Sequence, residues 1–301
     1  MPDAPPLVIV NPTAGGGRPA RIVGWLRNRP ELRGGGLVEV TSRSGEAESL
    51  AARAGARGYR RVIVVGGDGT IQEVVNGLLA APAPPSLGIV PLGSGNDLAR
   101  SLGLPTDTGR AWRVAVGAAE RRVDVAVASG NGGTRRFASA GGIGFDAQVA
   151  AAMAVRRGWQ RGRAGYLLTT LGELRRFVNR RVRLSVDGTV ITRDVLFVAI
   201  ANGAYYGGGM KIAPGASLDD GMLDLCVVGD VSRLTALRQI PGLYRGTHVR
   251  HPAVEMLSGR QIEVEGDEET RIHLDGEPWG GLPMRIRVEP SALVVAAPPR
   301  V

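Results

Sequence analysis

The residues best suited to chemistry follow an apolar run that ends at Val65, where Gly66-Gly67-Asp68-Gly69-Thr70 leads into a helical pattern. Glycines let backbone N–H groups approach an anion closely, and a helix N-terminus adds the positive end of its dipole. Thr70 and Glu73 have the spacing of a capping box, which predicts a helix start there. Asp68 would repel a phosphate unless it contacts a metal ion or accepts a proton. The segment therefore predicts a phosphate-binding loop that carries a functional carboxylate.

Two further loops share this composition. The apolar run 87–90 leads into Pro91-Leu92-Gly93-Ser94-Gly95-Asn96-Asp97, and the run 8–10 leads into Asn11 and the glycines at 15–17. Loops that leave the carboxyl ends of neighbouring parallel strands converge on one crevice. No Gly-x-Gly-x-x-Gly motif occurs, which disfavours a Rossmann dinucleotide site. Together the three loops predict one anion-binding site.

The cationic residues limit how an anion could be held. The formal charge is +9, but of the 37 Lys and Arg residues only Lys211 is a lysine. Its context, GGGMKIAP, fits neither a P-loop, nor the strand lysine of a protein kinase, nor a Schiff-base lysine. Phosphates would therefore be held by backbone N–H groups and arginine. The positive charge favours a nucleic acid, an acidic membrane surface or a polyphosphate as partner. Nucleic acid is disfavoured because only 4% of the residues are aromatic and no helix-turn-helix or zinc-finger signature occurs.

Two domains are expected to position these loops, because 301 residues exceed what one hydrophobic core usually supports. Residues 1–125 alternate apolar strands with helical patterns, which predicts an α/β nucleotide-binding domain with a parallel sheet and flanking helices. Residues 126–301 show strands bounded by Gly, Asn and Asp, which predicts a mainly antiparallel β-sandwich. The last strand is a candidate to return to the first domain.

The predicted elements can be given by range. In the first domain the strands are Leu7–Val10, Leu37–Val40, Val62–Val65 and Leu87–Val90, and the helices are Ala20–Arg29, Glu46–Arg57, Ile71–Ala80 and Asp97–Leu102. The later strands are Asp124–Ala128, Arg135–Ala140, Val182–Val186, Thr189–Ile200, Leu223–Val228, Gln261–Glu265, Arg271–Leu274, Arg285–Val288 and Ala292–Ala297. Asp187-Gly188 predicts a hairpin turn.

Other features bear on location. No apolar run approaches the roughly 18–20 residues that span a bilayer, and the N-terminus lacks a secretory signal, so a cytoplasmic protein is expected. The single cysteine, Cys226, lies in an apolar run and is predicted to be buried. Helical inserts at 147–178 and 232–244 interrupt the second domain. The first mixes arginines with apolar side chains, which suits either peripheral contact with an anionic membrane or an ordinary solvent-facing helix.

Six motifs in this order resemble the diacylglycerol kinase catalytic family, which includes bacterial lipid kinases and sphingosine kinases. They are NPTAGGGR, GGDGTIQEVVNGL, PLGSGNDLAR, GGIGFDAQV, LDDGMLDL and LDGEPW, and they cover nearly the whole chain. The resemblance implies a cytoplasmic, peripherally membrane-associated kinase that uses ATP and Mg²⁺ to phosphorylate a lipid hydroxyl, with ATP between an α/β domain and a β-sandwich. Diacylglycerol, which would give phosphatidic acid in phospholipid biosynthesis, is the leading acceptor.

The resemblance also implies roles for individual positions. It assigns ATP contacts to Asn11, Pro12, Thr13, Ala14, Gly15, Thr41, Gly66, Gly67, Asp68, Gly69, Thr70 and Ser94. It places Asp68, Asp97 and Asp124 near the phosphates or their magnesium. Glu277 resembles the family's proton acceptor, with Asp275 as a close companion and Asp68 as an alternative acceptor. Ser217, Asp220 and Met222 resemble a structural magnesium loop, since hard cations take oxygen ligands.

Two other functions stay open at this level. An NAD kinase-like phosphotransferase would share the GGDGT loop but bind a dinucleotide, and a catalytically silent protein could bind nucleotide and lipid for regulation. PLGSGND and LDGE favour the lipid kinase over the first alternative, and the intact carboxylates disfavour the second. His248 and His251 have no third metal ligand in view and are predicted to serve packing or the surface. Edge strands of the second domain leave a homodimer possible.

Overall fold

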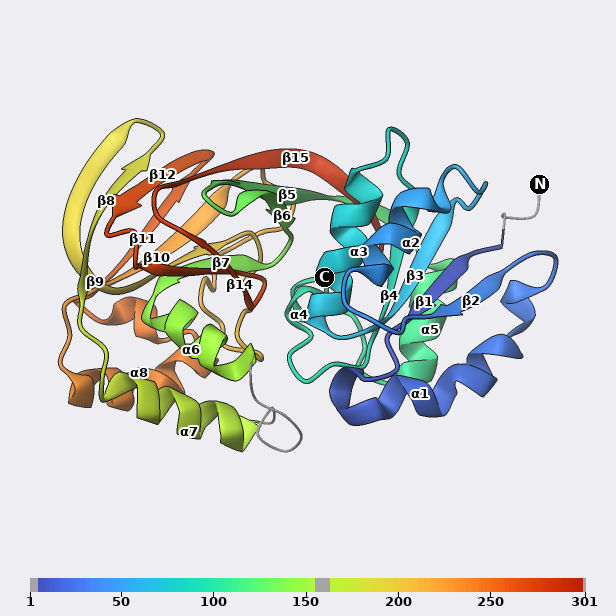
Figure 1. The fold of residues 1–301 in the computed structure, drawn as a ribbon, viewed down its shortest axis with the longest axis horizontal. Coiled ribbons are helices and arrows are strands. Elements are labelled where there is room, and N and C mark those ends of the chain that lie inside the picture. Colours follow the sequence, from blue (N-terminus) through green and yellow to red (C-terminus); the bar gives the residue numbers. More distant parts are fainter. Residues whose placement is uncertain (1–4, 155–162, 300–301) are drawn as a thin grey trace. The chain divides into compact units, whose positions relative to one another are not determined.

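A computed structural model of the chain describes residues 5–154 and 163–299. Its contacts divide the chain into unit 1, residues 1–123 with 291–301, and unit 2, residues 124–290 (Figure 1). Unit 1 is an α/β structure with parallel strands, and unit 2 is mainly antiparallel. The fold class predicted from the sequence is therefore confirmed.

The sheet of unit 1 sets the position of the three loops. Its order is β4-β3-β1-β2, formed by Ser86–Pro91, Arg61–Gly66, Leu7–Val10 and Leu37–Val40. All three pairings are parallel, so Val10, Val65 and Val90 lie at the same edge as neighbours in register. The end of β15 (Met284–Ala296) joins β4 as a further parallel neighbour through Val295 and Leu87. Every loop that leaves a carboxyl end in this sheet therefore begins at one edge.

Helices cover both faces of this sheet (Figure 1). They are α1 Ala14–Arg27, α2 Glu46–Ala54, α3 Asp68–Leu79, α4 Asp97–Ser101 and α5 Thr108–Gly117, with a short 3₁₀ turn at Pro30–Leu32. Helix α5 was not predicted, although its Trp112 is fully buried against strand residues such as Val8 and Ile63. Helix α1 begins at Ala14, six residues earlier than predicted, but Gly15, Gly16 and Gly17 have positive, non-helical φ angles, so its first turn is kinked.

The capping-box prediction for α3 is wrong. The helix begins at Asp68 with Gly67 as N-cap, and no side chain caps it. The Thr70 hydroxyl instead accepts a hydrogen bond from the Asn11 amide at 2.9 Å. Glu73 accepts bonds from the Ala47 N–H and the Ser44 hydroxyl, both 3.2 Å, and so joins α3 to the start of α2. Hydrogen bonds to residues distant in the sequence therefore replace the local cap that the spacing predicted.

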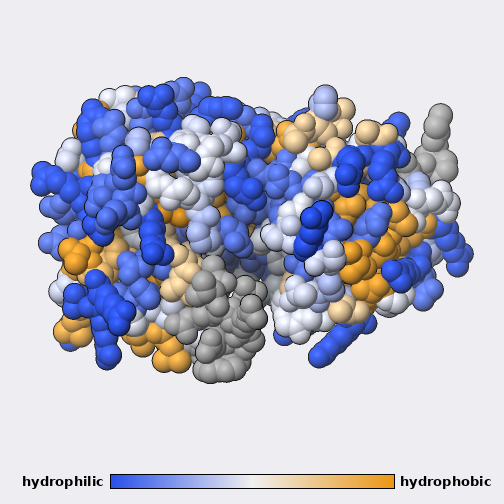
Figure 2. All heavy atoms as spheres, in the orientation of Figure 1, coloured by the Kyte–Doolittle hydropathy of each residue, from blue (hydrophilic) through white to orange (hydrophobic). Residues whose placement is uncertain are grey.

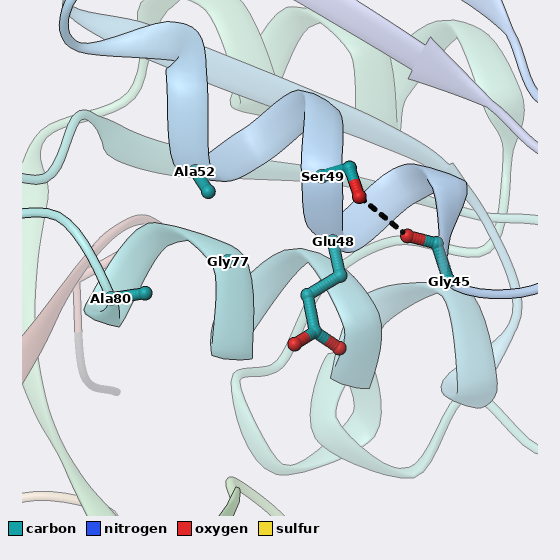
Figure 3. Close-up of a pocket in the computed structure, with 6 residues that line it drawn as sticks. All are labelled: Gly45, Glu48, Ser49, Ala52, Gly77 and Ala80. Atoms are coloured by element: carbon teal, nitrogen blue, oxygen red, sulfur yellow. Dashed lines mark hydrogen bonds between the residues drawn. The ribbon is translucent and has the colours of Figure 1, made fainter.

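Helices α2 and α3 cross closely at a glycine. A Cβ built on Gly77 would lie 2.2 Å from the Glu48 carbonyl oxygen, so only glycine permits this approach. A hollow of about 350 Å³ lies beside the crossing, lined by Gly45, Glu48, Ser49, Ala52, Gly77 and Ala80 (Figure 3). The Ser49 hydroxyl donates to the Gly45 carbonyl at 3.2 Å there. The hollow faces the C-terminal half of α3, away from the Gly66–Thr70 loop, and has one ionisable side chain.

Unit 2 is built around a long antiparallel path, β14-β13-β7-β9-β8-β12-β15, with β10, β11, β5 and β6 beside it. The strands are β5 Glu120–Gly130, β6 Gly133–Phe137, β7 Ala140–Gly144, β8 Arg180–Val186, β9 Thr189–Ala201, β10 Leu223–Gly229, β11 Val254–Gly259, β12 Gln261–Gly266, β13 Arg271–Leu274 and β14 Glu277–Gly281. The predicted strand Arg135–Ala140 is wrong as one element, since it spans the end of β6 and the start of β7. Arg285–Val288 and Ala292–Ala297 are parts of the single strand β15, and β11 and β14 were not predicted.

Alternation along β9 produces two cores. Val198 and Ile200 enter a core shared with β8, β10, β12 and β15, whereas Phe197 and Ala199 face a second core on the other side. Because both faces of β9 are covered, its sequence from Val195 to Ala201 is continuously apolar. The predicted hairpin is confirmed, with Asp187 and Gly188 at φ 48° and 88° between β8 and β9.

Helices α6 Phe145–Ala154, α7 Arg163–Leu174 and α8 Arg233–Arg245 contribute to the second core. Helix α8 begins after Ser232, whose hydroxyl accepts from the Thr235 N–H, and ends at Gly246 with φ 71°. The predicted insert 147–178 therefore contains two helices, and its arginines at 156, 157 and 161 lie outside the described residues. Among the described helices, none combines the length and apolar composition that a bilayer crossing needs.

Candidate functional site

The three glycine-rich loops of unit 1 pack directly against one another. A Cβ on Gly15 would lie 1.8 Å from the Leu92 carbonyl oxygen, and a Cβ on Gly93 would lie 2.5 Å from the Gly67 Cα. Such distances are far below van der Waals contact, so these glycines are required by the approach of backbone to backbone. The convergence predicted from the sequence is therefore present within unit 1.

Hydrogen bonds fix the register of the loops. The Asn11 N–H donates to the Val65 carbonyl at 3.1 Å, and the Leu92 N–H donates to the Gly66 carbonyl at 2.8 Å, so each strand pairing continues into its loop. The Asn11 carboxamide then joins two loops, because it donates to Thr70 and accepts from the N–H and hydroxyl of Thr13. The N-terminus of α3, with its dipole, is thus held beside the glycine turn.

Asp68 connects the second loop to the third. One carboxylate oxygen accepts the Asn96 N–H and the other accepts the Asp97 N–H, both at 2.7 Å. Burial raises the pKa of Asp68, against the opposing effects of these two bonds and of the Arg100 charge. A Cβ on Gly95 would lie 2.6 Å from an Asp68 oxygen and 3.5 Å from an Asp97 oxygen, so the two carboxylates flank one backbone position. Paired oxygen donors of this kind suit a hard divalent cation.

The structure places the remaining predicted residues of unit 1 at the same strand edge. Thr41 follows β2, where its N–H and hydroxyl both donate to the Val10 carbonyl, and Ser94 is exposed on the third loop. Two residues were missed. Asn96 has φ 58° and exchanges side-chain hydrogen bonds with the backbone of Gly93, and the Arg100 guanidinium donates to the Gly95 carbonyl. The Ser-Gly-Asn sequence was a usable signal, since Asn tolerates positive φ in turns.

In unit 2, the two acidic residues of the LDGE motif, Asp275 and Glu277, have different environments. The Asp275 carboxylate accepts three backbone N–H bonds, from Ala138, Ser139 and Ala140, at 2.9–3.0 Å. Asp275 also has φ 49°, so these bonds hold it in the left-handed region. Glu277, two residues later at the start of β14, has an exposed side chain. Asp275 thus anchors the turn, and Glu277 projects from it.

Asp124 also belongs to unit 2, where it contacts the predicted metal loop. It is 1% exposed, its N–H donates to the Leu218 carbonyl at 2.6 Å, and a carboxylate oxygen accepts the Gly221 N–H at 2.7 Å. Within the loop, Asp220 accepts the Met222 N–H at 3.0 Å. Burial raises the pKa of nearby Asp224, and the Asp220 charge adds to this effect. The Asp124 carboxylate and the Asp220 side chain thus each accept a backbone N–H group of the loop.

Other candidate residues serve packing. Across residues 5–154 and 163–299, no group of three or more His, Cys, Asp and Glu side chains is arranged to hold a metal ion. His248 is 1% exposed with a ring nitrogen 3.1 Å from the Ile212 carbonyl, and burial lowers its pKa. Cys226 is buried as predicted, and burial raises the pKa of its thiol to about 12.

The chain matches known proteins over both units. A family model described as the diacylglycerol kinase catalytic domain matches residues 5–128, and one described as the YegS C-terminal NAD kinase beta sandwich-like domain matches residues 139–297. A diacylglycerol kinase of Mycobacterium tuberculosis (strain H37Rv) is 33% identical over 294 residues, which is 96% of this chain and 94% of the relative.

Two further relatives agree. A Chromohalobacter salexigens protein named "Probable lipid kinase YegS-like" is 35% identical over 87% of this chain and 83% of its own length. The crystal structure of a "putative diacylglycerol kinase" from Bacillus anthracis superposes with a TM-score of 0.80, at 26% identity, over 98% of this chain and 95% of that one. The resemblance inferred from the six motifs is confirmed, and the chain belongs to the family of diacylglycerol kinases and YegS-like lipid kinases.

Proposed function

We propose that this protein transfers the γ-phosphoryl group of ATP to a lipid hydroxyl, with diacylglycerol as the acceptor and phosphatidic acid as the product. The observation that carries the proposal is the packing of three glycine-rich loops at one strand edge in unit 1, with Asp68 hydrogen-bonded across two of them. Phosphoryl transfer depends on positioning and charge stabilisation rather than on covalent chemistry by the protein. Rigid backbone loops beside a helix N-terminus supply both.

The triphosphate would be held without lysine. The only lysine of the chain, Lys211, belongs to unit 2, so backbone N–H groups around Gly15, Gly67 and Ser94 and the dipole of α3 take its place. Arg18 is exposed directly after the glycine turn and can add a positive charge. Asn11, Pro12, Thr13, Ala14, Thr41, Gly66, Gly69 and Thr70 complete the proposed ATP site.

Asp68 and Asp97 would hold the catalytic Mg²⁺ with the phosphates, and Asp124 is proposed as a further contributor. The two carboxylates that flank Gly95 are the donor set that such an ion prefers. When bound, Mg²⁺ spreads the negative charge that develops on the transferred group. A second ion would be held in unit 2 by the Asp220 side chain and the carbonyls of Ser217 and Met222, with a structural role.

Glu277 is proposed as the acceptor of the hydroxyl proton. An acceptor must reach solvent and substrate, and the Glu277 side chain is exposed at the start of β14. Asp275 is a poorer candidate because three backbone N–H groups already occupy its oxygens and stabilise its charged form. Asp68 remains the alternative, since burial raises its pKa, even though both of its oxygens also accept backbone N–H groups.

Helices α7 and α8 are proposed as the surface that contacts an anionic membrane. Leu168 on α7 and Leu234 and Tyr244 on α8 are 59%, 56% and 43% exposed. Exposed Arg233, Arg238 and Arg245 accompany them on α8, and Figure 2 shows hydrophobic beside hydrophilic atoms over this region at its lower left. Apolar side chains interleaved with arginine suit the headgroup region of an anionic bilayer. Exposed edge strands leave homodimer formation as a further proposal.

A kinase assay with γ-labelled ATP and Mg²⁺ tests the function. Diacylglycerol, sphingosine, ceramide, phosphatidylglycerol and NAD are offered separately, and products are resolved by thin-layer chromatography. We expect labelled phosphatidic acid, with more product from vesicles that contain anionic lipid than from neutral ones. Label on NAD alone would instead support the NAD kinase-like function, and nucleotide and lipid binding without product would support the regulatory one.

A further inference from the structure

Three buried polar side chains in unit 2 form a cluster that the proposed chemistry does not use. They are Asp146 on α6, Tyr206 in the segment after β9, and His273 on β13, with exposures of 6%, 8% and 1%. His273 Nε2 lies 3.4 Å from Asp146 Oδ2, and the Tyr206 hydroxyl donates to the same oxygen at 3.2 Å. The Tyr206 and His273 rings are stacked, with centroids 5.6 Å apart. Helix α6 packs against both β13 and β14 (Figure 1), so the cluster lies at the contact between this helix and the β13–β14 hairpin.

The cluster is tightly packed against β7. A Cβ on Gly142 would lie 1.9 Å from Asp146 Oδ2 and 2.4 Å from His273 Nε2, so the carboxylate and the ring occupy the space that glycine leaves. Asp146 Oδ1 also accepts the Ala147 N–H at 2.8 Å. The carboxylate is therefore fixed on both oxygens. Buried polar groups that are hydrogen-bonded in this way usually hold a side chain in one defined orientation.

The hydrogen bonds assign a tautomer to His273. The Gly276 N–H donates to His273 Nδ1 at 3.2 Å, so Nδ1 carries a lone pair and no proton. In the neutral imidazole the proton is then on Nε2, which lies 3.4 Å from the Asp146 carboxylate as an electrostatic contact without a hydrogen bond. A proton on Nδ1 would instead point at the Gly276 N–H and break this bond. The ring can accept from Gly276 only while Nδ1 is unprotonated.

Gly276 lies between Asp275 and Glu277, in the turn that joins β13 to β14. Asp275 and Gly276 have φ angles of 49° and 85°, and residues other than glycine rarely have such positive values. Asp275 ties the first residue of the turn to residues 138–140, and His273 ties the second. The two anchors together determine the direction in which the next residue, Glu277, leaves the turn.

We propose that His273 is a positioning residue for phosphoryl transfer: in its Nε2–H form, oriented by Asp146 and Tyr206, it holds the Gly276 N–H and thereby the orientation of Glu277. The proposal rests on the proposed role of Glu277 as proton acceptor. Among the described residues, the titratable groups beside the ring are Asp146 from α6 and Tyr206 from the segment after β9, and Cys226 on β10 lies close enough for the Asp146 charge to act on its thiol. Protonation of Nδ1 is expected to release the turn and reduce turnover.

Two substitutions separate the two ring nitrogens. In His273→Asn the side-chain oxygen takes the place of Nδ1 and can accept from Gly276, whereas in His273→Gln the amide reaches the place of Nε2 and leaves Gly276 without an acceptor. We expect kcat for lipid phosphorylation to fall about 10-fold or more in His273→Gln, the effect of one lost buried hydrogen bond, with the KM for ATP unchanged. His273→Asn should stay within about 3-fold of wild type, as the acceptor is retained.

His251 provides a matched control. Its Nδ1 accepts the Ala253 N–H at 3.2 Å, the same kind of contact in the turn before β11. Gln and Asn substitutions at 251 should leave kcat unchanged. Thermal unfolding of all variants separates loss of fold from loss of positioning. Equal kcat losses in His273→Gln and His273→Asn, or wild-type kcat in both, would overturn the proposal.

A second measurement does not depend on activity. The chain has three histidines, so ¹⁵N-imidazole NMR of the full-length protein can be assigned by single substitution. We expect His273 to show an unprotonated Nδ1 at neutral pH and the Gly276 amide resonance to shift in His273→Gln.

The pH dependence of kcat adds a comparison between variants. Wild-type kcat should fall over the pH range in which NMR shows that His273 Nδ1 takes up a proton. His273→Asn should lack that part of the acid limb, whereas the part caused by protonation of Glu277 should remain in both proteins.

The two hypotheses can fail separately. Full activity of Glu277→Gln would remove the proposed acceptor, while the tautomer and the Gly276 amide shift would still test the hold of His273 on the turn. An Nδ1–H tautomer at neutral pH, or an unchanged kcat while His273 becomes protonated, would overturn the positioning role whatever lipid is phosphorylated. If His273→Gln does not fold, the acid limb of wild type against His273→Asn decides.

Discussion

The glycine loops of unit 1 and the LDGE turn of unit 2 are held in position by different forces. In unit 1 the loops contact one another mainly through backbone, with Gly15 against Leu92 and Gly67 against Gly93. In unit 2 the turn is held by side chains, with Asp275 and His273 accepting backbone N–H groups. A backbone-built site is sensitive to added volume, whereas a side-chain-built turn is sensitive to lost acceptors and to protonation.

The difference fits the two proposed tasks. A triphosphate presents many charges that do not change during transfer, so fixed N–H dipoles suit it. A proton acceptor must be exposed and correctly aimed, which requires anchors outside the reacting group itself. The same contrast determines which substitution should damage which step.

The largest effect is expected from removing the reacting carboxylates, one in each region. Asp68→Asn and Glu277→Gln should each lower kcat by about 10²-fold or more, in line with acid–base contributions, and leave the fold intact. Steady-state assays with ATP and diacylglycerol measure this, and Glu269→Gln, an exposed carboxylate before β13, at the opposite end of the strand from the turn, is the control. Wild-type turnover in both variants would remove the assigned roles.

The next effect tests the backbone-built site. Gly15→Ala places a Cβ 1.8 Å from the Leu92 oxygen, so the first and third loops must separate, and ATP affinity should fall about 10-fold or more, equivalent to about 1.4 kcal/mol. Gly16→Ala is the matched control, because Gly16 also has positive φ but nothing within 4 Å of the added Cβ. Calorimetric titration with ATP and Mg²⁺ compares them. Equal losses would mean that backbone strain, not loop contact, governs binding.

A smaller effect tests the side-chain-built turn. Asp275→Asn keeps one acceptor oxygen for two of the three N–H groups, so one N–H group loses its partner. At about 1.5–3 kcal/mol for a charge-assisted bond, the free energy of unfolding should fall by about 2 kcal/mol. It should also lower kcat about 10-fold. Asp187→Asn changes a similar Asp-Gly turn, with φ 48° and N–H bonds from Arg260 and Gln261, remote from the motif in sequence. A stability loss without a kcat loss is expected there, and equal kcat losses would contradict the assignment.

The smallest effect concerns pH and stability. Because burial raises the pKa of Asp68, the fold favours its neutral form, and that contribution to stability is present at low pH and lost as pH rises through the folded pKa. The Tm of Asp68→Asn relative to wild type should therefore increase in apo protein as pH rises above 3.8, the ordinary pKa of an aspartate. Glu46→Gln should show the opposite slope only as pH falls below 4.5, since bonds from the N–H and hydroxyl of Ser42 lower the pKa of Glu46 and stabilise its charged form. Differential scanning fluorimetry from acid to mildly alkaline pH reads both, and parallel slopes would contradict the burial argument.

Much of the fold could be predicted from local patterns. The strands Leu7–Val10 and Leu37–Val40 matched at both ends, because short apolar runs between turn residues have little choice of structure. Helix α5 and strand β14 were missed, since Trp112 and Trp279 are buried through long-range packing that periodicity does not reveal. The capping box failed for the same reason, as Asn11 and Ala47 lie far from Thr70 and Glu73 in sequence.

The sequence by itself determined which groups are available for chemistry, namely glycines beside Asp68 that can bind an anion and Glu277, two residues after Asp275, as a proposed proton acceptor. Tertiary structure alone decided which groups act together. The N–H groups of Asn96 and Asp97 donate to Asp68, and the Gly276 N–H donates to His273 Nδ1. No spacing pattern in the sequence predicts these hydrogen bonds. The physical reason is that burial and hydrogen bonding are properties of the folded surroundings, so the state of a carboxylate or an imidazole is set only once those surroundings exist.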